Sequence, residues 1–195
     1  MGKKIRIHGL GASNHSDYKR AKNDYYSTDP SAITLLHKQS LLDKDKPYWE
    51  TACGEGSLSN ELRRLGYDVA KETDLINRDI GETGKDFFDY DEKFNGNLIT
   101  NPPYYCINDW ILHSLSLTDD KVYIFCRIQT LESMNRYEKI FKNNPPVHVC
   151  PFVKRINCYL MGDLEFKKKA STICYAWFIW DNKDTSGETK IKWLI

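Results

Sequence analysis

Short apolar runs, separated by polar turns, alternate along most of the chain with segments in which apolar residues recur at helical spacing. The strand-like runs lie at residues 48–52, 68–73, 84–88, 97–100, 122–126, 147–152 and 172–180. The helix-like segments begin after Pro30 and after Gly56, and two more cover residues 107–117 and 131–141. We expect Arg136, Lys139 and Lys142 on the solvent side of the last one. Strands that alternate with helices predict right-handed βαβ units and a mainly parallel sheet.

One domain is expected over residues 24–195, because 195 residues is a single-domain length and no linker or repeat interrupts the pattern. Residues 1–23 show no clear period and contain scattered lysines and arginines, so we expect a flexible basic tail there. Ordered structure should begin near Asp24, with Thr28 or Asp29 capping the first helix.

The composition is that of a globular chain, with 41% hydrophobic and 28% charged residues. No apolar run reaches the roughly 18 residues of a membrane span, and the N-terminus lacks the apolar stretch of a signal peptide. We therefore expect a cytoplasmic protein. Its six cysteines are dispersed without a C-x-x-C pair, which argues against a metal site and for reduced thiols.

The net charge of +1 provides no overall field that would attract a polyanion. A local basic segment lies within residues 153–171, where basic residues outnumber acidic ones; its candidate nucleic-acid contacts are Lys154, Arg155, Lys167, Lys168 and Lys169. A solvated surface loop would explain the same residues.

The turn Asn101-Pro102-Pro103-Tyr104 follows the apolar run 97–100 and therefore leaves the end of a buried strand. Two prolines fix φ and provide no N–H, so strand pairing stops and nearby carbonyls remain free. An amide side chain, the Pro102 carbonyl and an aromatic ring on a stiff turn form an acceptor site for a flat molecule with an exocyclic NH2. An ordinary proline-rich turn with a surface tyrosine is the alternative.

Other polar or glycine-rich positions also fall at predicted strand ends, namely the Cys53-Gly54-Glu55-Gly56 turn, Asp74 and Asp86. In an open parallel sheet such positions gather at the ligand-binding edge. Asp74 follows Gly56 by 18 residues, close to the interval at which an acid accepts ribose hydroxyls. Asp86 could accept from an adenine amino group, and Phe87 could pack on its ring. Each acid alone would also fit a strand-end cap. The turn lacks G-x-G-x-x-G and a phosphate-loop lysine, which favours a nucleoside without a pyrophosphate.

Together these segments resemble class I S-adenosylmethionine-dependent methyltransferases of the amino type, and more closely the compact adenine-N6 DNA methyltransferases of phages and prophages. The resemblance implies a Rossmann-like α/β fold with a mainly parallel seven-stranded sheet, one antiparallel strand and helices on both faces. It also implies one catalytic domain, residues 24–195, without a separate target-recognition domain. The implied S-adenosylmethionine contacts are Tyr26, Thr28, Glu50, Cys53, Gly54, Gly56, Asp74, Leu75, Asp86, Phe87 and Asn101. The implied catalytic residues are Asn101, Pro102, Pro103 and Tyr104.

The resemblance further implies that the target adenine is flipped out of DNA and stacked on Tyr104, while the Asn101 side-chain oxygen and the Pro102 carbonyl accept its amino hydrogens. Transfer would then be direct, without a covalent enzyme intermediate. The same turn would serve an RNA adenine, a cytosine N4 or a protein glutamine amide. A non-catalytic binding module that keeps the fold is a further alternative. With no room for a recognition domain, either the basic segment reads a short sequence, or specificity is low, or a second subunit contributes.

Overall fold

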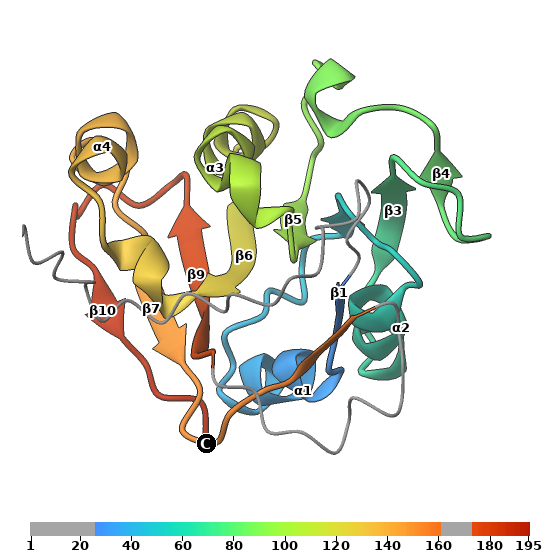
Figure 1. The fold of residues 1–195 in the computed structure, drawn as a ribbon, viewed down its shortest axis with the longest axis horizontal. Coiled ribbons are helices and arrows are strands. Elements are labelled where there is room, and N and C mark those ends of the chain that lie inside the picture. Colours follow the sequence, from blue (N-terminus) through green and yellow to red (C-terminus); the bar gives the residue numbers. More distant parts are fainter. Residues whose placement is uncertain (1–25, 161–172) are drawn as a thin grey trace, which may run out of the picture.

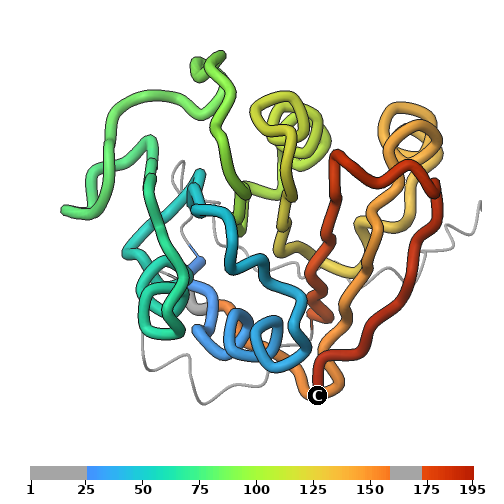
Figure 2. Tube along the Cα trace, turned by 180° about the vertical axis from the view of Figure 1, so that it is seen from behind, coloured from blue at the N-terminus to red at the C-terminus, as the bar shows by residue number. Residues whose placement is uncertain are grey.

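The computed structural model describes residues 26–160 and 173–195, together with the backbone pairing of the strands in those ranges (Figures 1 and 2). The expected basic tail, residues 1–23, lies outside the described residues. So do Lys167, Lys168 and Lys169.

A mixed sheet forms the centre of the described structure, with strand order β10-β7-β9-β6-β5-β2-β3-β4 (Figure 1). Its strands are β2 Tyr48–Glu50, β3 Val69–Asp74, β4 Glu82–Thr83, β5 Asn97–Thr100, β6 Lys121–Arg127, β7 His148–Pro151, β9 Tyr175–Asp181 and β10 Lys190–Ile191. Among these strands β9 alone runs antiparallel to its neighbours, β6 and β7. The expected α/β class, with a mainly parallel sheet and one antiparallel strand, is confirmed, although eight strands pair rather than seven.

Six of the seven expected strand runs form strands of the sheet, but the run 84–88 does not. Gly84 adopts a φ of 85°, which turns the chain away after the two-residue strand β4. Asp86 then starts a 3₁₀ turn over Phe87–Asp89, because its Oδ1 accepts the Phe88 N–H at 3.0 Å. Asp86 therefore caps a short turn and does not end a strand.

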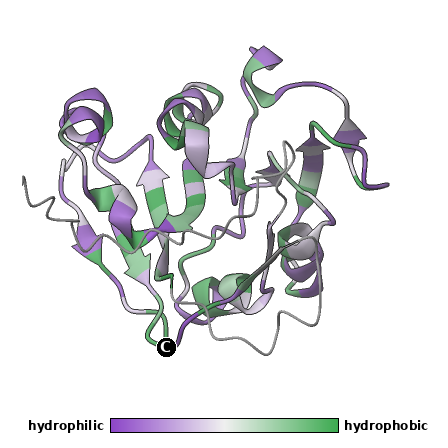
Figure 3. Cartoon of the chain, viewed as in Figure 1, coloured by the Kyte–Doolittle hydropathy of each residue, from purple (hydrophilic) through white to green (hydrophobic). Residues whose placement is uncertain are grey.

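Helices cover both faces of the sheet, as expected. Helices α1 (Ser31–Lys38) and α2 (Ser57–Arg64) pack against one face, and α3 (Ile107–Ser116) packs against the other. Successive strand residues point to opposite faces: Tyr48, Tyr123 and Trp177 belong to the first core cluster, and Trp49, Ile124 and Phe178 to the second. Figure 3 shows hydrophobic residues along the central strands and hydrophilic ones along β4. This two-sided burial holds the strand ends in place.

The helix expected over residues 131–141 forms from Met134 onward: α4 (Met134–Arg136) continues directly into a π turn, Tyr137–Phe141, and a separate 3₁₀ turn, Ile128–Leu131, precedes them. Arg136 is half-buried rather than on the solvent side. Its guanidinium donates to the carbonyls of Thr130 at 2.6 Å and Glu132 at 2.9 Å, so these carbonyls bind a side chain in place of helical N–H groups.

A second, two-stranded sheet pairs β1 (Tyr26–Thr28) with β8 (Cys158–Leu160) in antiparallel register. Of the two expected capping residues, Asp29 rather than Thr28 binds the start of α1, because Asp29 Oδ1 accepts from the backbone N–H and the hydroxyl of Ser31. The Thr28 hydroxyl is thereby left for a different contact, described below. In the described part of the chain, no helix is long and apolar enough to cross a membrane.

Candidate functional site

The candidate site lies at the carboxyl ends of β2, β3 and β5. Strand β2 is at the centre of this group, because it pairs with β3 on one side and with β5 on the other. The crossover after β2 leads to β3, while β5 lies across from it, so the connections diverge at β2 (Figure 1). This divergence is the place where open α/β sheets bind ligands.

The turn after β2 approaches the end of β3 closely. The backbone N–H of Gly54 donates to Asp74 Oδ2 at 2.9 Å. Gly54 and Gly56 have φ values of 56° and 72°, a region in which residues with a side chain are strained. A β-carbon on Gly56 would lie 3.1 Å from Ile80 Cδ1. The structure thus brings Gly54 and Asp74 together; Gly54 and Gly56 are buried, and Glu55 between them is exposed.

The Asp74 carboxylate binds several groups at the end of β3. Besides Gly54, its carboxylate accepts the Ile76 N–H at 2.8 Å and an ion pair from Arg78 Nη1 at 3.0 Å. Ribose hydroxyls would therefore either share this carboxylate with Arg78 or take the place of the Arg78 guanidinium. Leu75 follows directly and is 54% exposed, so it offers an apolar surface beside the carboxylate.

Glu50 is turned into the protein rather than toward the open edge. It is 2% exposed, and its Oε2 accepts the Ser59 N–H at 2.9 Å and the Ser59 hydroxyl. Burial, which outweighs the hydrogen bonds from Ser59, raises the pKa of Glu50 from 4.5 to about 8. Glu50 therefore fixes α2 beneath the glycine turn and does not itself face a ligand.

This raised pKa predicts a pH-dependent stability. Between pH 4.5 and about 8 the folded state binds the Glu50 proton and the unfolded state does not, so stability should fall as the pH rises through this range. Glu50→Gln cannot ionise, and its melting temperature relative to the native chain should therefore increase from pH 5 to pH 9. Thermal unfolding of both proteins at several pH values measures this. A difference that does not change with pH would contradict the assignment.

Phe87 does not face the candidate site. It is 4% exposed and its ring is stacked on Trp110, with centroids 4.3 Å apart. It belongs to the core against Trp49 and His113, which corrects its expected place on a cofactor ring. The neighbouring Phe88 is 40% exposed, so its ring is accessible from solvent, and Asp86 is exposed as well.

The Asn101 amide is held in one orientation. Its Nδ2 donates to Thr28 Oγ1 at 2.9 Å and to the Tyr26 carbonyl at 3.2 Å, and a carbonyl can only accept, so the nitrogen must face β1. Oδ1 consequently points the other way, where it accepts the Tyr104 hydroxyl at 2.8 Å. Strand β1 also reaches the start of α2, because the hydroxyls of Ser27 and Ser57 lie 2.6 Å apart. It therefore connects the Asn101 turn to the glycine turn.

Pro102 is buried, and none of the described residues donates a backbone hydrogen bond to its carbonyl. Pro103 precedes a 3₁₀ turn, Tyr104–Cys106, that leads into α3. Burial raises the pKa of Tyr104 well above its usual value, so its hydroxyl stays protonated and donates to Asn101. The Arg127 guanidinium lies 5.3 Å from the centre of the Tyr104 ring, in a cation–π contact.

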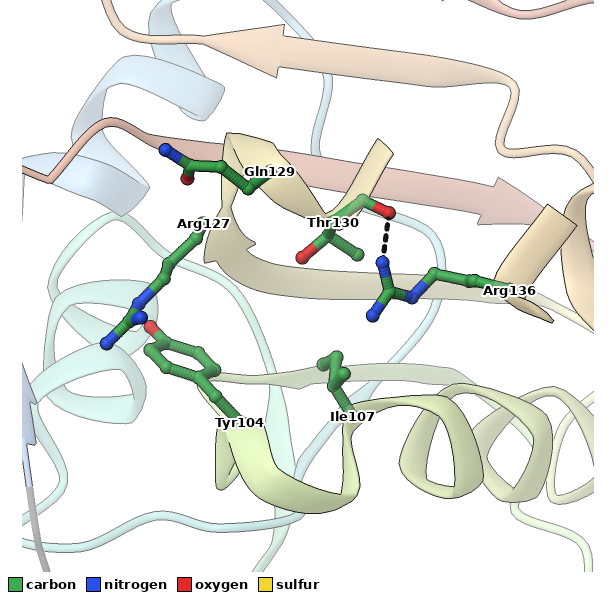
Figure 4. Close-up of a pocket in the computed structure, with 6 residues that line it drawn as sticks. All are labelled: Tyr104, Ile107, Arg127, Gln129, Thr130 and Arg136. Carbon is green, nitrogen blue, oxygen red and sulfur yellow. Dashed lines mark hydrogen bonds between the residues drawn. The ribbon is translucent and has the colours of Figure 1, made fainter. Parts of the chain in front are cut away.

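A cavity of about 170 Å³ opens beside Tyr104 (Figure 4). It is lined by Tyr104, Ile107, Arg127, Gln129, Thr130 and Arg136. Of these residues the sequence predicted only Tyr104 as a site residue. Arg127 ends β6, the strand next to β5, so the rule that ligands bind at strand ends would have found it.

The basic segment is described only in part. Lys154 and Arg155 are exposed. Arg155 lines a second cavity, of about 270 Å³, together with Ile128, Tyr175 and Trp193. Tyr175 is the strand partner of Arg127, so this cavity adjoins the end of β6. The described residues contain no cluster of histidine, cysteine and acidic side chains that could hold a metal ion.

Neither a protein-family model nor a curated protein matches the chain. Solved structures do. A protein from Listeria monocytogenes, described as a class I S-adenosylmethionine-dependent methyltransferase, has a TM-score of 0.56 at 13% identity, with 83% of this chain and 61% of that chain covered. The type I restriction-modification methyltransferase subunit from Streptococcus thermophilus has a TM-score of 0.62 at 12% identity, with 91% and 49% covered.

The magnesium protoporphyrin IX methyltransferase of Synechocystis, solved with bound S-adenosylmethionine, has a TM-score of 0.51 at 14% identity, with 76% of this chain and 75% of that chain covered. The chain spans only about half to three fifths of the length of the Listeria and Streptococcus proteins. At such low identity the likeness establishes a shared fold, the Rossmann-like fold of class I methyltransferases.

Proposed function

We propose that the chain is an S-adenosylmethionine-dependent methyltransferase that methylates the N6 amino group of adenine in DNA. One observation carries the proposal: the Asn101 turn leaves β5 directly beside the strand ends that hold Gly54 and Asp74, in a fold shared with methyltransferases. A planar amino group and a methyl donor would meet at this edge.

The donor set fits the nucleoside part of S-adenosylmethionine. Asp74 supplies a carboxylate for the ribose hydroxyls and Leu75 an apolar surface for the adenine, and the backbone of the glycine turn lies beside that carboxylate. Tyr26 and Thr28 lie between the glycine turn and Asn101, where the methionine part would run. When bound, the cofactor supplies an electrophilic methyl group on a sulfonium.

The chain's own residues would orient the acceptor amine. Asn101 Oδ1 is aimed by the contacts of Nδ2 with β1, and the Tyr104 hydroxyl that now occupies it can yield to an amino N–H. With the Pro102 carbonyl as second acceptor, both amino hydrogens would be held and the nitrogen lone pair released from the ring. Positioning of this kind can supply about 7–11 kcal/mol.

Three thiols near the candidate site, all among the described residues, are protonated, which is compatible with direct transfer. Burial raises the pKa values of Cys53, Cys126 and Cys158 to about 12, so these thiols stay protonated at neutral pH. Cys53 lies in the glycine turn, and the other two lie close to Tyr104. These residues therefore fill space and provide no covalent intermediate.

Thr28 should act as a positioning residue for Asn101. It is 3% exposed, and its hydroxyl is an acceptor for the Asn101 amide. Thr28→Val keeps the shape but removes the hydrogen bond, and we expect methyl transfer at saturating S-adenosylmethionine to slow about 2- to 10-fold. Thr28→Ser should retain the native rate. Single-turnover rates of the three proteins test this, and equal rates for valine and threonine would rule out the role.

The substrate is tested by transfer of a labelled methyl group from S-adenosylmethionine to unmethylated DNA, to RNA and to a protein extract. The proposal predicts label in DNA. Label in RNA or in protein amides would keep the amino-methylation chemistry and replace the substrate. Cofactor binding without transfer to any acceptor would favour a binding module that retains the fold.

A further inference from the structure

We propose that the cavity lined by Arg127 and Arg136 binds a phosphate group of the acceptor while Tyr104 receives the acceptor's base. This inference rests on the proposed function and makes it narrower, because it requires a nucleotide-containing acceptor. The shared chemistry is a phosphate ester next to a planar base, whether in a polynucleotide or in a free nucleotide.

Arg136 has no counter-charge among the described residues. Its guanidinium is half-buried and, within this part of the chain, donates to neutral oxygens, those of the Asn108 side chain at 2.6 Å and the Thr130 and Glu132 backbones. Within residues 26–160 and 173–195, no carboxylate forms an ion pair with it. A partly desolvated cation without an anion is costly, and a bound anion would offset that cost.

Arg127 offers a second guanidinium to an anion in this cavity. Across the part of the chain that the structure describes, it likewise has no carboxylate partner, and its guanidinium lies over the Tyr104 ring. Guanidinium groups bind phosphate with two parallel hydrogen bonds. A base that stacks on Tyr104 can displace the Arg127 guanidinium, which is then free to bind the phosphate of the same strand.

The location of the two arginines also fits a phosphate next to a base. Figure 4 shows Arg127 beside the Tyr104 ring and Arg136 on the side of Ile107, with Thr130 between the two arginines. The volume of about 170 Å³ is below the roughly 300 Å³ of drug-sized ligand pockets. A compact group would fill it. A glutamine amide in a protein carries no charge, so two arginines beside Tyr104 favour an anionic acceptor over a peptide.

The experiment measures binding of a single-stranded oligodeoxynucleotide containing adenine to the full chain at several salt concentrations. Arg127→Gln is the main variant, because its side chain contacts only the Tyr104 ring among the contacts described above. Arg136→Gln is the second. Arg64→Gln is the matched control: Arg64 pairs with Glu61 at the last turn of α2. We expect affinity to fall about 10-fold or more for each cavity variant.

The salt dependence separates a phosphate contact from a structural role. Each lost phosphate contact to a single strand should reduce the slope of log K against log salt by about 0.7, whereas the control should keep the native slope. The rise in melting temperature with S-adenosylmethionine should be the same in all four proteins, because it reports the cofactor site. Unchanged slopes in both cavity variants, or no oligonucleotide binding by the native chain, would overturn the proposal.

Two further measurements complete the test: competition by free nucleosides and nucleotides, and methyl transfer to DNA. Competition by deoxyadenosine monophosphate, but not by deoxyadenosine, would support a phosphate site that accepts free nucleotides; competition by neither would support a site for polynucleotides when the slopes change as expected. If the slopes are unchanged but DNA is methylated, the phosphate site is wrong and the proposed function stands. If the slopes change but no methyl group is transferred, the phosphate site stands and the proposed function is wrong.

Discussion

Asn101→Ala should lower the rate of methyl transfer about 100- to 1,000-fold, the range found when one oriented polar group that stabilises a transition state is removed. In the proposed function Asn101 Oδ1 would be one of two acceptors for the amino hydrogens, and its direction is set by two bonds from Nδ2 to β1. Single-turnover rates with saturating cofactor measure the effect.

Asn143→Ala is the matched control for this change. Asn143 is exposed in the turn after Phe141, and a native rate is expected. Because Asn101 also ties β1 to the turn, the unfolding transition of Asn101→Ala should be measured alongside its rate. Asn101→Gln keeps an amide but moves its oxygen, and it should be nearly as slow. A native rate in either Asn101 variant would remove Asn101 from the reaction.

Asp74→Asn should weaken S-adenosylmethionine binding by about 10- to 100-fold. A hydrogen bond to a charged group contributes about 1.5–3 kcal/mol, and each 1.4 kcal/mol changes affinity about tenfold. Asparagine retains one acceptor for the Ile76 N–H but loses the charge. Isothermal titration of the full chain gives the dissociation constant, and the rise in melting temperature with cofactor provides an independent readout.

Arg78→Ala serves as the companion variant for Asp74. Arg78 holds the carboxylate in an ion pair that ribose hydroxyls would have to share. Its removal should leave the affinity for S-adenosylmethionine unchanged or make it tighter. Asp74→Asn with native affinity would show that the cofactor does not use this carboxylate, whatever Arg78→Ala does.

The central sheet was predictable from the sequence for a physical reason. Strands β5 and β6 are buried on both faces, so consecutive apolar residues fill their middle positions, and the turns that follow them contain proline or polar residues. The run 84–88 misled because its two phenylalanines look strand-like, whereas Gly84 and the capping bond of Asp86 turn the chain. Local hydrogen bonding decided the structure there.

The β1–β8 pair could not be predicted in the same way. Its strands have three residues each and pair across more than 100 residues of chain, so no local pattern marks them. That pair nevertheless aims Asn101. The sequence motif therefore identified the turn, while the contacts that orient its amide, and the placement of Arg136 beside it, depend on tertiary structure.

The candidate residues for the methyl donor, the reacting amine and the acceptor phosphate follow neighbouring strands along one sheet edge. Groups suited to a nucleoside follow β2 and β3. The Asn101 amide and the Pro102 carbonyl follow β5, and Arg127 ends β6. The order of these strands in the sheet is therefore the order in which donor, reacting amine and acceptor phosphate would lie.

The most direct test of this account is nucleoside analysis by mass spectrometry of unmethylated DNA incubated with the full chain and methyl-deuterated S-adenosylmethionine. The account predicts deuterated N6-methyldeoxyadenosine with the native chain, and a loss of that product with Asn101→Ala. Deuterated product formed equally well by Asn101→Ala, or label found on a carbon or on another base, would contradict it.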